Sequence, residues 1–417
     1  MDEGDEKKPD RTTSFTPTPY PRPRAEPETG RSGRARSAAR VASRVVVALA
    51  SVLALLATGY AYTTLDEIDD NVQTTDALQQ NDDVEAKAPP QDDGATDILL
   101  VGADARTDMQ GNPLPLDVLK TLRTESKNGV STDTLIILRI PKDGGKPTGV
   151  SIPRDTWVDV PQGGRDKINS AFGVAKAAAA ARLRAEGMTD GAEVERESDQ
   201  AGRRALVRTV QDFTEIRIDH YAEVNLLGFY LLTEALGGVT VCLNNATADK
   251  DSGANFRAGT QVVSGGEALS FVRQRKNLPR GDLDRIVRQQ AFLASALHQV
   301  LSTGTLTNSD KLNSLTDAVR RSLVLDPDLD LLKFADQVKG IASGDIEFVT
   351  IPVEAVGARS ADGQSIVEVD VPKVRSFVRG TVGAGGTADQ PAAGAGGGSA
   401  PGSAPRQITA DGVACVN

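Results

Sequence analysis

Residues 149–155 read Gly149-Val150-Ser151-Ile152-Pro153-Arg154-Asp155. The first four favour a β-strand, and Pro153 fixes its own φ and biases Ile152 toward extended backbone, so the strand should end just before Arg154. Open α/β folds bind their ligands at the carboxyl edge of the sheet. The stretch therefore predicts that Arg154 lies at such an edge, although an exposed ion pair closing a strand explains these two charged residues equally well when they are taken alone.

Apolar stretches on either side of this one extend the sheet. We expect buried strands over 97–102 and 134–140, and later strands over 220–224, 239–243, 346–353 and 365–371. Helices are predicted over 169–185, 200–213, 226–236, 267–272, 282–301, 311–324, 329–341 and 372–379, with a polar surface insertion over 187–199. Alternating strands and helices predict an α/β fold, which we expect to be a layered α-β-α domain with a central mixed sheet.

Composition excludes several classes of function. The 417 residues carry a net charge of −10, so the chain shows no overall signature of nucleic-acid binding. With two Cys and two His in the whole chain, a structural zinc site and histidine-based catalysis are both disfavoured. A metal ion in this protein would be a hard cation held by carboxylates.

The amino-terminal part predicts a membrane anchor. Residues 1–44 are polar and end in an arginine-rich stretch, as expected of a disordered cytoplasmic tail. Residues 45–62 contain no charge and would span about 27 Å as a helix, so we predict a transmembrane helix over 45–65. Arginines before it and acidic residues after it place the following domain outside the cell. A cleaved signal peptide is the alternative, although the tail is long and no small-x-small cleavage site closes the segment.

The remaining boundaries follow from composition. We expect a spacer over 66–95, a catalytic domain over 96–302, accessory helices and strands packed on it over 303–380, a flexible linker over 381–405 and a carboxyl-terminal segment over 406–417. Cys242 and Cys415 would both lie outside the membrane, where disulfides persist. We therefore predict a disulfide that ties the last segment to the strand bearing Cys242, with two free thiols as the alternative.

Charged residues stand at the ends of the predicted elements. Asp104 follows the first strand and Asp133 precedes the second, and two carboxylates suit one Mg²⁺ ion that also binds substrate phosphates. Guanidinium groups suit the oxygens of a pyrophosphate. The basic residues in such positions are Arg154, Lys167, Arg273, Arg275, Arg285 and Arg288. Arg285, Arg288 and Gln289 are spaced to share one face of their helix.

These residues and their neighbours resemble motifs of the LytR-CpsA-Psr family of envelope phosphotransferases. The matching pieces occur in family order over about residues 96–302, and together they are specific. They are 99–106 (LLVGADAR), 131–134 (STDT), 150–155 (VSIPRD), 166–169 (DKIN), 218–221 (IDHY), 235–239 (ALGGV), 271–275 (FVRQR), 282–285 (DLDR) and 288–290 (RQQ). One departure is Val130, where many members carry arginine before the Ser-x-Asp.

The resemblance implies an activity. Family members transfer a glycopolymer from a polyprenyl-pyrophosphate carrier to a peptidoglycan sugar hydroxyl and form a phosphodiester, next to membrane lipid and without nucleic acid. Carried over, Asp104 and Asp133 resemble the magnesium ligands, with Arg154 as a further catalytic residue. Arg154, Arg273, Arg275 and Arg285 resemble pyrophosphate clamps, supported by Arg106, Lys167 and Gln289. The sequence leaves two alternatives open, a polyprenyl-pyrophosphate hydrolase and a non-catalytic envelope or regulatory protein.

Overall fold

The computed structural model describes residues 73–78, 93–125, 130–161, 164–301, 314–315, 317–319, 322–329, 346–381, 408–409 and 413–417. The predicted tail, the transmembrane helix and all but the first residue of the linker lie outside these ranges, as does the predicted helix over 329–341 beyond its first residue. Within the described ranges, no helix is both long and apolar enough to cross a membrane.

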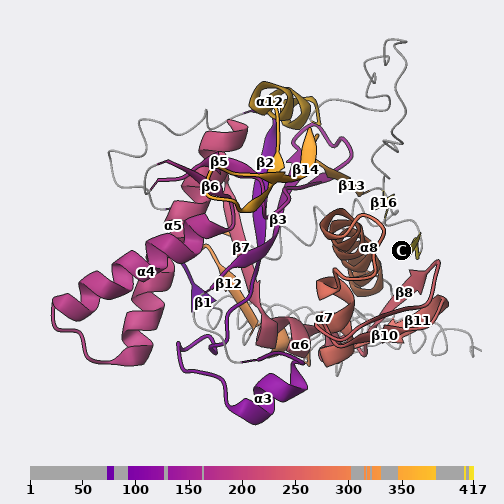
Figure 1. Ribbon diagram of the computed structural model, residues 1–417, viewed down its shortest axis with the longest axis horizontal. Coiled ribbons are helices and arrows are strands. Elements are labelled where there is room, and N and C mark those ends of the chain that lie inside the picture. The colour runs from indigo at the N-terminus through magenta and orange to yellow at the C-terminus, as the bar shows by residue number, and fades with distance from the viewer. Residues whose placement is uncertain are drawn as a thin grey trace, which may run out of the picture. The chain divides into compact units, whose positions relative to one another are not determined.

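A mixed β-sheet forms the centre of the described structure (Figure 1). Its strands, in spatial order, are β1 (Gln73–Thr74), β12 (Leu323–Leu325), β7 (His220–Asn225), β2 (Ala95–Ala103), β3 (Thr132–Pro141), β4 (Thr148–Ser151), β13 (Glu347–Thr350) and β16 (Ile408–Thr409). β2 runs parallel to β7 and antiparallel to β3, while β4 runs antiparallel to β3 and parallel to β13. The predicted α/β fold with a central mixed sheet is therefore confirmed.

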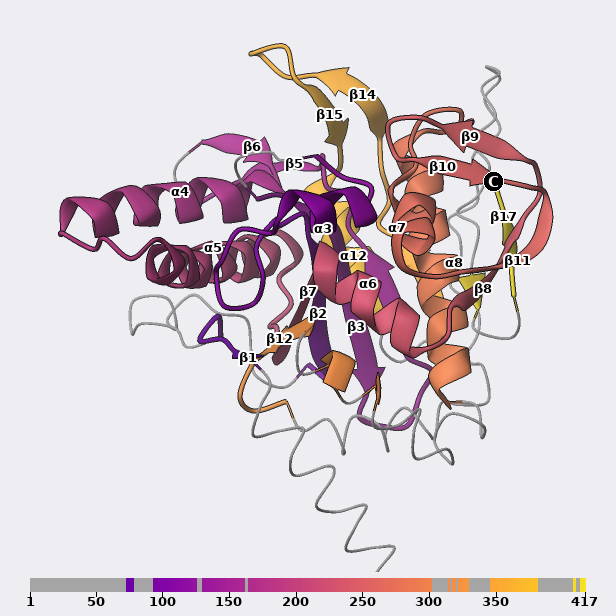
Figure 2. The same ribbon diagram turned by 90° about the horizontal axis from the view of Figure 1, so that it is seen from below.

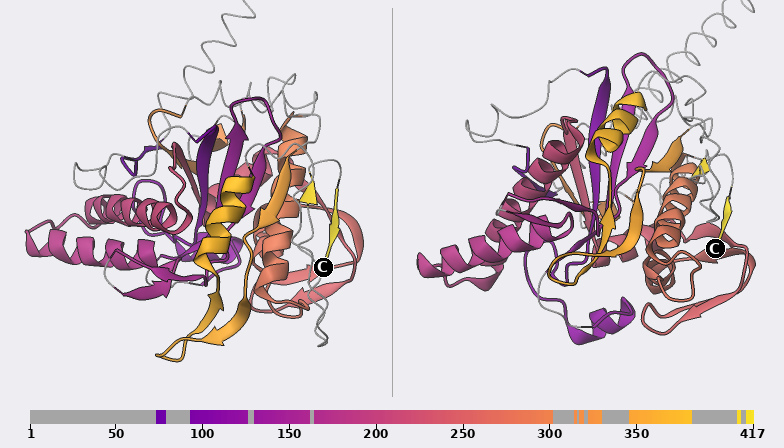
Figure 3. Two further views of the ribbon diagram at one scale, coloured as in Figure 1. Left: turned by 90° about the horizontal axis from the view of Figure 1, so that it is seen from above. Right: turned by 45° about the horizontal axis from the view of Figure 1, so that its top comes forward.

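Helices cover both faces of this sheet (Figure 2). One face packs on α4 (Ser170–Ala185), α5 (Gly191–Thr214) and α12 (Val371–Gly380), and the other on α6 (Leu226–Ala235), α7 (Gly265–Arg273) and α8 (Asp282–Leu301). Successive strand residues point to opposite faces, so Leu99 joins the first core and Ile98 the second. Figure 3 shows α12 lying over the sheet from two directions.

The strand β7 fastens α5 to the sheet. Arg203 of α5 donates from Nε and Nη2 to the two carboxylate oxygens of Glu223, each over 2.9 Å, and the Tyr221 hydroxyl donates to Glu223 over 2.6 Å. All three side chains are buried. A bidentate pair of this kind is satisfied only in one geometry, so it fixes the position of α5 on the strand.

Smaller elements surround these layers. Short strand pairs are β5 (Trp157–Asp159) with β6 (Arg165–Lys167), β9 (Thr247–Asp249) with β10 (Ala254–Phe256), and β14 (Ala355–Arg359) with β15 (Ser365–Glu368), and α3 (Leu116–Thr121) follows β2. A further sheet joins β11 (Gly259–Val263), β8 (Val239–Leu243) and β17 (Cys415–Val416). In that sheet Cys415 lies opposite Cys242 in register, and the structure joins the two by a disulfide.

Two described strands of the segment 303–380 belong to the central sheet instead of packing on it. β12 lies between β1 and β7, and β13 lies beside β4. The predicted helix over 311–324 is accordingly wrong at its end, because Leu323 begins β12. Val324 and Leu325 are buried there and pair with β7. The run 323–325 is short and apolar and could equally be helical, so its pairing with β7 decides that it forms a strand.

The predicted surface insertion over 187–199 is wrong as well. Helix α5 begins at Gly191, where the Asp190 side chain caps it by accepting hydrogen bonds from the amides of Ala192 and Glu193. Two carboxylates of this stretch face α4, since Lys176 Nζ lies 2.6 Å from carboxylate oxygens of both Glu195 and Asp199. A polar helix face that meets another helix resembles a solvated loop in composition.

Candidate active site

Three strands bring charged residues to one edge of the sheet. β2 and β4 both run antiparallel to β3, so their carboxyl ends meet the amino end of β3. Asp104 directly follows β2, Asp133 is the second residue of β3, and Arg154 comes three residues after the end of β4. The edge predicted from the stretch around Arg154 therefore exists, and it gathers both predicted carboxylates.

A β-bulge sets the direction of Asp133. Gly102 pairs with Thr134 and Ala103 pairs with Thr132, so Asp133 is the extra residue between two consecutive pairs. Bulges re-aim a side chain and recur beside active sites. Beyond the bulge, the Asp104 amide donates to the Ser131 carbonyl oxygen over 2.8 Å. The two acidic residues are thus held on adjacent strands.

A cavity of about 1260 Å³ opens at this edge and continues between the sheet and the helices α6, α7 and α8. Its polar lining includes Asp104, Arg106, Asp133, Arg154, Arg273, Arg275, Asp282, Arg285 and Gln289. Its apolar lining includes Leu100, Ile136, Ala222, Val224, Leu232, Phe292, Leu293, Ala296 and Leu297. Along α8 the lining changes from Arg285 to Leu297, a distance of about 18 Å at the rise of an α-helix. The cavity therefore has a charged mouth and a long apolar interior.

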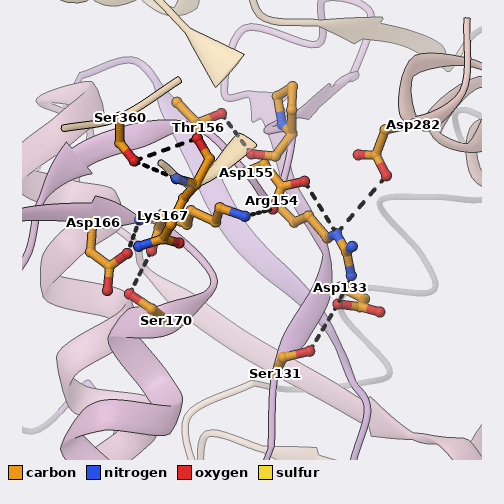
Figure 4. Close-up of polar contacts among 12 residues, drawn as sticks. Ser131, Asp133, Arg154, Asp155, Thr156, Asp166, Lys167, Ser170, Asp282 and Ser360 are labelled. Atoms are coloured by element: carbon orange, nitrogen blue, oxygen red, sulfur yellow. Dashed lines mark hydrogen bonds and ion pairs between the residues drawn. The ribbon is translucent and has the colours of Figure 1, made fainter. Parts of the chain in front are cut away.

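Arg154 is surrounded by carboxylates at this mouth (Figure 4). Its Nη1 lies 2.7 Å from Asp133 Oδ1, and its Nε lies 3.7 Å from Asp155 Oδ2 and 3.9 Å from Asp282 Oδ1. Burial alone would lower the pKa of Arg154, but the three carboxylates outweigh it and raise this pKa above its usual value. The guanidinium is therefore charged at every physiological pH.

The pKa of Asp133 is lowered. Burial pushes this pKa upward, but the charges of Arg154 and Arg285, together with hydrogen bonds from Arg154 and Ser131, outweigh the burial. The Ser131 hydroxyl donates to Asp133 Oδ1 over 2.9 Å. Asp133 is consequently an anion, suited to hold a cation and unsuited to take up a proton near neutral pH.

Asp282 joins three arginines, and sequence reasoning gave it no role. Its Oδ1 lies 2.9 Å from Arg285 Nη2, 3.1 Å from Arg275 Nε and 3.9 Å from Arg154 Nε. Arg285 is almost fully buried, and burial is the main cause that lowers its pKa to about 10, so it too stays charged at neutral pH. The available signal was the position of Asp282 in the first turn of α8, three residues before Arg285.

Two further arginines bind the segment after α3. Arg106 donates from Nε to the Glu125 carbonyl oxygen over 2.7 Å, and its Nη2 lies 3.1 Å from Asp104 Oδ2. Arg273 donates to the Thr124 hydroxyl over 3.4 Å. Both line the cavity, so the structure brings these two predicted residues to the mouth.

Lys167 and Gln289 hold supporting positions. Lys167 does not line the cavity; its Nζ lies 3.2 Å from Asp155 Oδ1, on the far side of Arg154 (Figure 4). Gln289 lines the cavity and donates to the Val272 carbonyl oxygen over 3.2 Å. Lys167 therefore acts on the mouth through Asp155, while Gln289 reaches it directly.

Arg288 is not a pyrophosphate ligand in this structure, contrary to the prediction. It is fully buried, it does not line the cavity, and it donates to Gln274 Oε1 over 2.7 Å. Residues three apart on a helix differ by about 60° around its axis. This angle turns Arg288 away from the mouth, although its neighbours Arg285 and Gln289 both reach it.

The carboxylates of the mouth fit a magnesium ion only in part. Asp104 Oδ1 is buried and, among the described residues, accepts no hydrogen bond, as expected of an oxygen left for a cation. Those residues contain no group of three or more acidic, His or Cys side chains able to hold a metal. Two carboxylates suit Mg²⁺, which completes its shell with water and substrate oxygens.

Comparisons with known proteins identify the family of this chain. The model of the LytR_cpsA_psr family matches residues 58–380. The chain is 47% identical over 340 residues to the cell wall biosynthesis protein LcpA of Corynebacterium glutamicum, covering 82% of this chain and 65% of that protein. It is 33% identical over 239 residues to the polyisoprenyl-teichoic acid–peptidoglycan teichoic acid transferase TagU of Oceanobacillus iheyensis, covering 57% of this chain and 61% of that protein.

A solved structure is also similar. The crystal structure of B. subtilis TagV has a TM-score of 0.49 and 22% identity, covering 70% of this chain and 96% of that chain. This chain thus spans slightly less than two thirds of the length of the two relatives above.

Proposed function

Because the chain belongs to the LytR-CpsA-Psr family, we propose that it transfers a glycopolymer from a polyprenyl-pyrophosphate carrier to a peptidoglycan sugar hydroxyl, forming a phosphodiester. TagU, which is similar over 57% of this chain, is named for a polyisoprenyl-linked teichoic acid and for peptidoglycan. Those names support the class of carrier and acceptor proposed for this chain.

The observation that carries the proposal is the shape and lining of the cavity. Its apolar interior, lined by side chains such as Leu232, Phe292 and Leu297, suits a polyprenyl chain. Its mouth presents Arg154, Arg275 and Arg285, which suit the two phosphates next to that chain. A hydrolase of soluble pyrophosphates has no need of such an apolar interior, so an amphiphilic substrate fits the cavity best.

The proposed reaction is an in-line displacement at phosphorus. The acceptor hydroxyl oxygen forms a bond to the phosphorus that carries the glycopolymer, the bond to the bridging pyrophosphate oxygen breaks, and polyprenyl phosphate leaves. The arginines hold the pyrophosphate and stabilise the charge that develops on its oxygens. The hydroxyl proton passes to Asp104 Oδ2, because Oδ1 is the oxygen left for the magnesium ion.

Asp104 and Asp133 would hold a magnesium ion at the mouth. When bound there, the ion would offset the negative charge of the pyrophosphate oxygens. Arg154 keeps Asp133 ionised, and Lys167 keeps Asp155 next to Arg154, so both side chains contribute through the electrostatics of the mouth.

The proposed location is the outer face of the cell membrane. We infer that residues 45–65 anchor the chain there with its amino terminus in the cytoplasm, because an uncharged stretch lies between arginines and acidic residues. This places the cavity on the side of the membrane where peptidoglycan and the disulfide-forming environment are found.

The test uses the full chain in detergent with a lipid-pyrophosphate-linked oligosaccharide and a peptidoglycan fragment, with and without Mg²⁺. Mass spectrometry would detect the joined product, with Arg154→Ala as the matched variant. A phosphodiester product that needs Mg²⁺ and Arg154 supports the transferase. Release of the sugar phosphate alone across a panel of acceptors would instead identify a hydrolase, and tight lipid binding without turnover would identify a non-catalytic protein.

A further inference from the structure

Arg288 is a buried cation that the proposed reaction does not use. Its guanidinium carbon lies 5.1 Å from the centroid of the Phe271 ring, and its Nη2 has no hydrogen-bond partner among the described residues. Burial lowers its pKa to about 10. Moving a guanidinium out of water costs free energy. A buried guanidinium therefore serves to hold its hydrogen-bond partners in one geometry more than to stabilise the fold. The burial of Arg288 therefore points to a role for its hydrogen bonds.

The hydrogen bonds of Arg288 join two distant parts of the chain. Its Nη1 donates to Gln274 Oε1 over 2.7 Å, and its Nε donates to the main-chain oxygen of Asn417 in a short hydrogen bond. One side chain on α8 thus contacts both the end of α7 and the strand β17.

Gln274 stands between two arginines of the mouth. It is fully buried, and its Nε2 donates to the Thr247 hydroxyl over 2.5 Å and to the Lys276 carbonyl oxygen over 3.0 Å. These bonds fix the turn in which Arg273 and Arg275 flank Gln274. Losing the bond to Arg288 would leave the buried Gln274 oxygen without a partner and would release the turn.

The strand β17 is fastened by a disulfide, by the buried side chain of Val416 and by a few hydrogen bonds. It contains two residues, and the Asn244 amide donates to the Val416 carbonyl oxygen over 2.8 Å. So short a strand offers few hydrogen bonds. The Cys242–Cys415 disulfide is the covalent cross-link that keeps Asn417 beside Arg288, and hydrogen bonds from the side-chain amides of Asn244 and Asn245 to Asn417 add to it.

We propose that Arg288 is a positioning residue that couples the disulfide-fastened strand β17, through Gln274, to Arg273 and Arg275 at the mouth. This role rests on the proposed function, in which those arginines bind pyrophosphate. Arg288 itself lies outside the cavity and does not touch the substrate. The structural link thus makes pyrophosphate affinity depend on a disulfide far away in the sequence.

The experiment measures binding of geranylgeranyl pyrophosphate to the full chain in detergent by calorimetry. Arg288→Met keeps much of the volume but removes both hydrogen bonds, while Arg288→Lys keeps the charge and can restore one of them. We expect Kd to rise about tenfold in Arg288→Met and less in Arg288→Lys, as is usual when a supporting partner of a ligand residue is lost. Arg182→Met, on the exposed side of α4, serves as the matched control and should bind like the parent.

The disulfide is tested in the same assay. Cys242→Ser/Cys415→Ser should weaken binding about as much as Arg288→Met, and combining the three substitutions should add little, because all act through one contact path. Dithiothreitol, which donates two electrons and two protons to the disulfide and becomes a cyclic disulfide itself, should weaken the parent but leave the double serine variant unchanged.

Steady-state turnover separates positioning from folding. A displaced arginine pair raises KM for the lipid pyrophosphate, whereas a smaller folded fraction lowers kcat at unchanged KM. The proposal is overturned if Arg288→Met binds like the parent, if only kcat falls along with Tm, or if the effects of Arg288→Met and the serine pair simply add. If the parent neither binds the lipid nor turns it over, the proposed function itself fails, and this role fails with it.

Discussion

Arg154 Nη1 and Asp133 Oδ1 lie 2.7 Å apart, joining a residue three positions after the end of β4 to the bulged residue of β3. The pair is partly buried and charge-assisted, so each side chain orients the other. It also lies at the cavity mouth, where the substrate pyrophosphate is proposed to bind. One contact thus fixes the positions of the two side chains that are proposed to hold a cation and to bind phosphate.

Replacing Arg154 by lysine should lower kcat/KM about 100-fold, a loss typical of removing one directed donor from a charged transition state. Lysine keeps the positive charge, but it lacks the planar guanidinium whose several N–H groups can bind a carboxylate and a phosphate at the same time. Kinetics with the lipid-linked substrate would measure the loss. An activity close to that of the parent would show that charge alone is sufficient at this position.

Replacing Asp104 by asparagine should abolish most of the magnesium-dependent turnover, by about 100-fold, while leaving Tm unchanged. Asp104 Oδ1 accepts no hydrogen bond from the described residues, so the amide disturbs little in the fold. A Mg²⁺ titration of turnover would measure the change, with Glu186→Gln on the exposed end of α4 as the control. Unchanged magnesium dependence would exclude Asp104 as a ligand.

Replacing Asp282 by asparagine should lower both kcat and KM. The carboxylate orients Arg154, Arg275 and Arg285, so without it the transition state is held less well, and kcat should fall about tenfold. The mouth also becomes more positive, so the ground-state pyrophosphate binds more tightly. A higher KM at unchanged kcat would contradict this view of Asp282.

The pKa of His220 predicts a pH dependence of stability outside the site. Its hydrogen bond with Asp326 is the largest of the causes that raise this pKa, against the opposing effect of burial. A raised histidine pKa contributes stability that is fully present below about pH 6.5 and is lost as the pH rises through the folded-state value. The pair joins a partly buried histidine to a buried aspartate and should contribute about 1 kcal/mol or less.

Tm measured from pH 6 to pH 9 would test this contribution. The difference in Tm between the parent and His220→Gln should shrink as the pH rises, while His298→Gln, an exposed residue of α8, should follow the parent. Parallel curves for the parent and His220→Gln would show that the ion pair with Asp326 is not formed.

Filling the cavity should discriminate between lipids by length. Ala296 lines the apolar interior about three turns beyond Arg285, so Ala296→Trp should weaken binding of a long polyprenyl pyrophosphate about tenfold and spare a short one. Ala177→Trp on the exposed face of α4 is the control. Equal weakening for both lipids would place the prenyl chain elsewhere.

The predicted fold was accurate where local signals and tertiary contacts agree. The strands around Ile98, Ile136 and Val150 were found because an apolar run bounded by turns leaves little choice. The conformation of Leu323 was missed because its partner strand, β7, is about a hundred residues away in sequence. The part of α5 before residue 200 was missed because Glu195 and Asp199 pair with Lys176 of α4, a contact that a polar composition does not reveal.

The site residues, too, could be predicted where local sequence signals agree with the tertiary contacts. Residues at strand ends, such as Asp104 and Asp133, could be placed together because strand direction fixes which ends meet. Arg288 could not be separated from Arg285 by spacing alone, since the choice between them depends on how α8 is rotated against α7. Asp282 was overlooked because a carboxylate among arginines is visible only once the three arginines are known to converge.

The alternation along β7 has a consequence for how this protein can evolve. Tyr221 and Glu223 fasten α5 on one face, while Ala222 and Val224 line the cavity on the other. Substitutions at the second pair can therefore narrow or widen the cavity without disturbing the buried Arg203–Glu223 ion pair. If the cavity holds a carrier lipid as proposed, a lineage could change its lipid specificity by substitutions on one side of a single strand, while selection for folding acts on the other side.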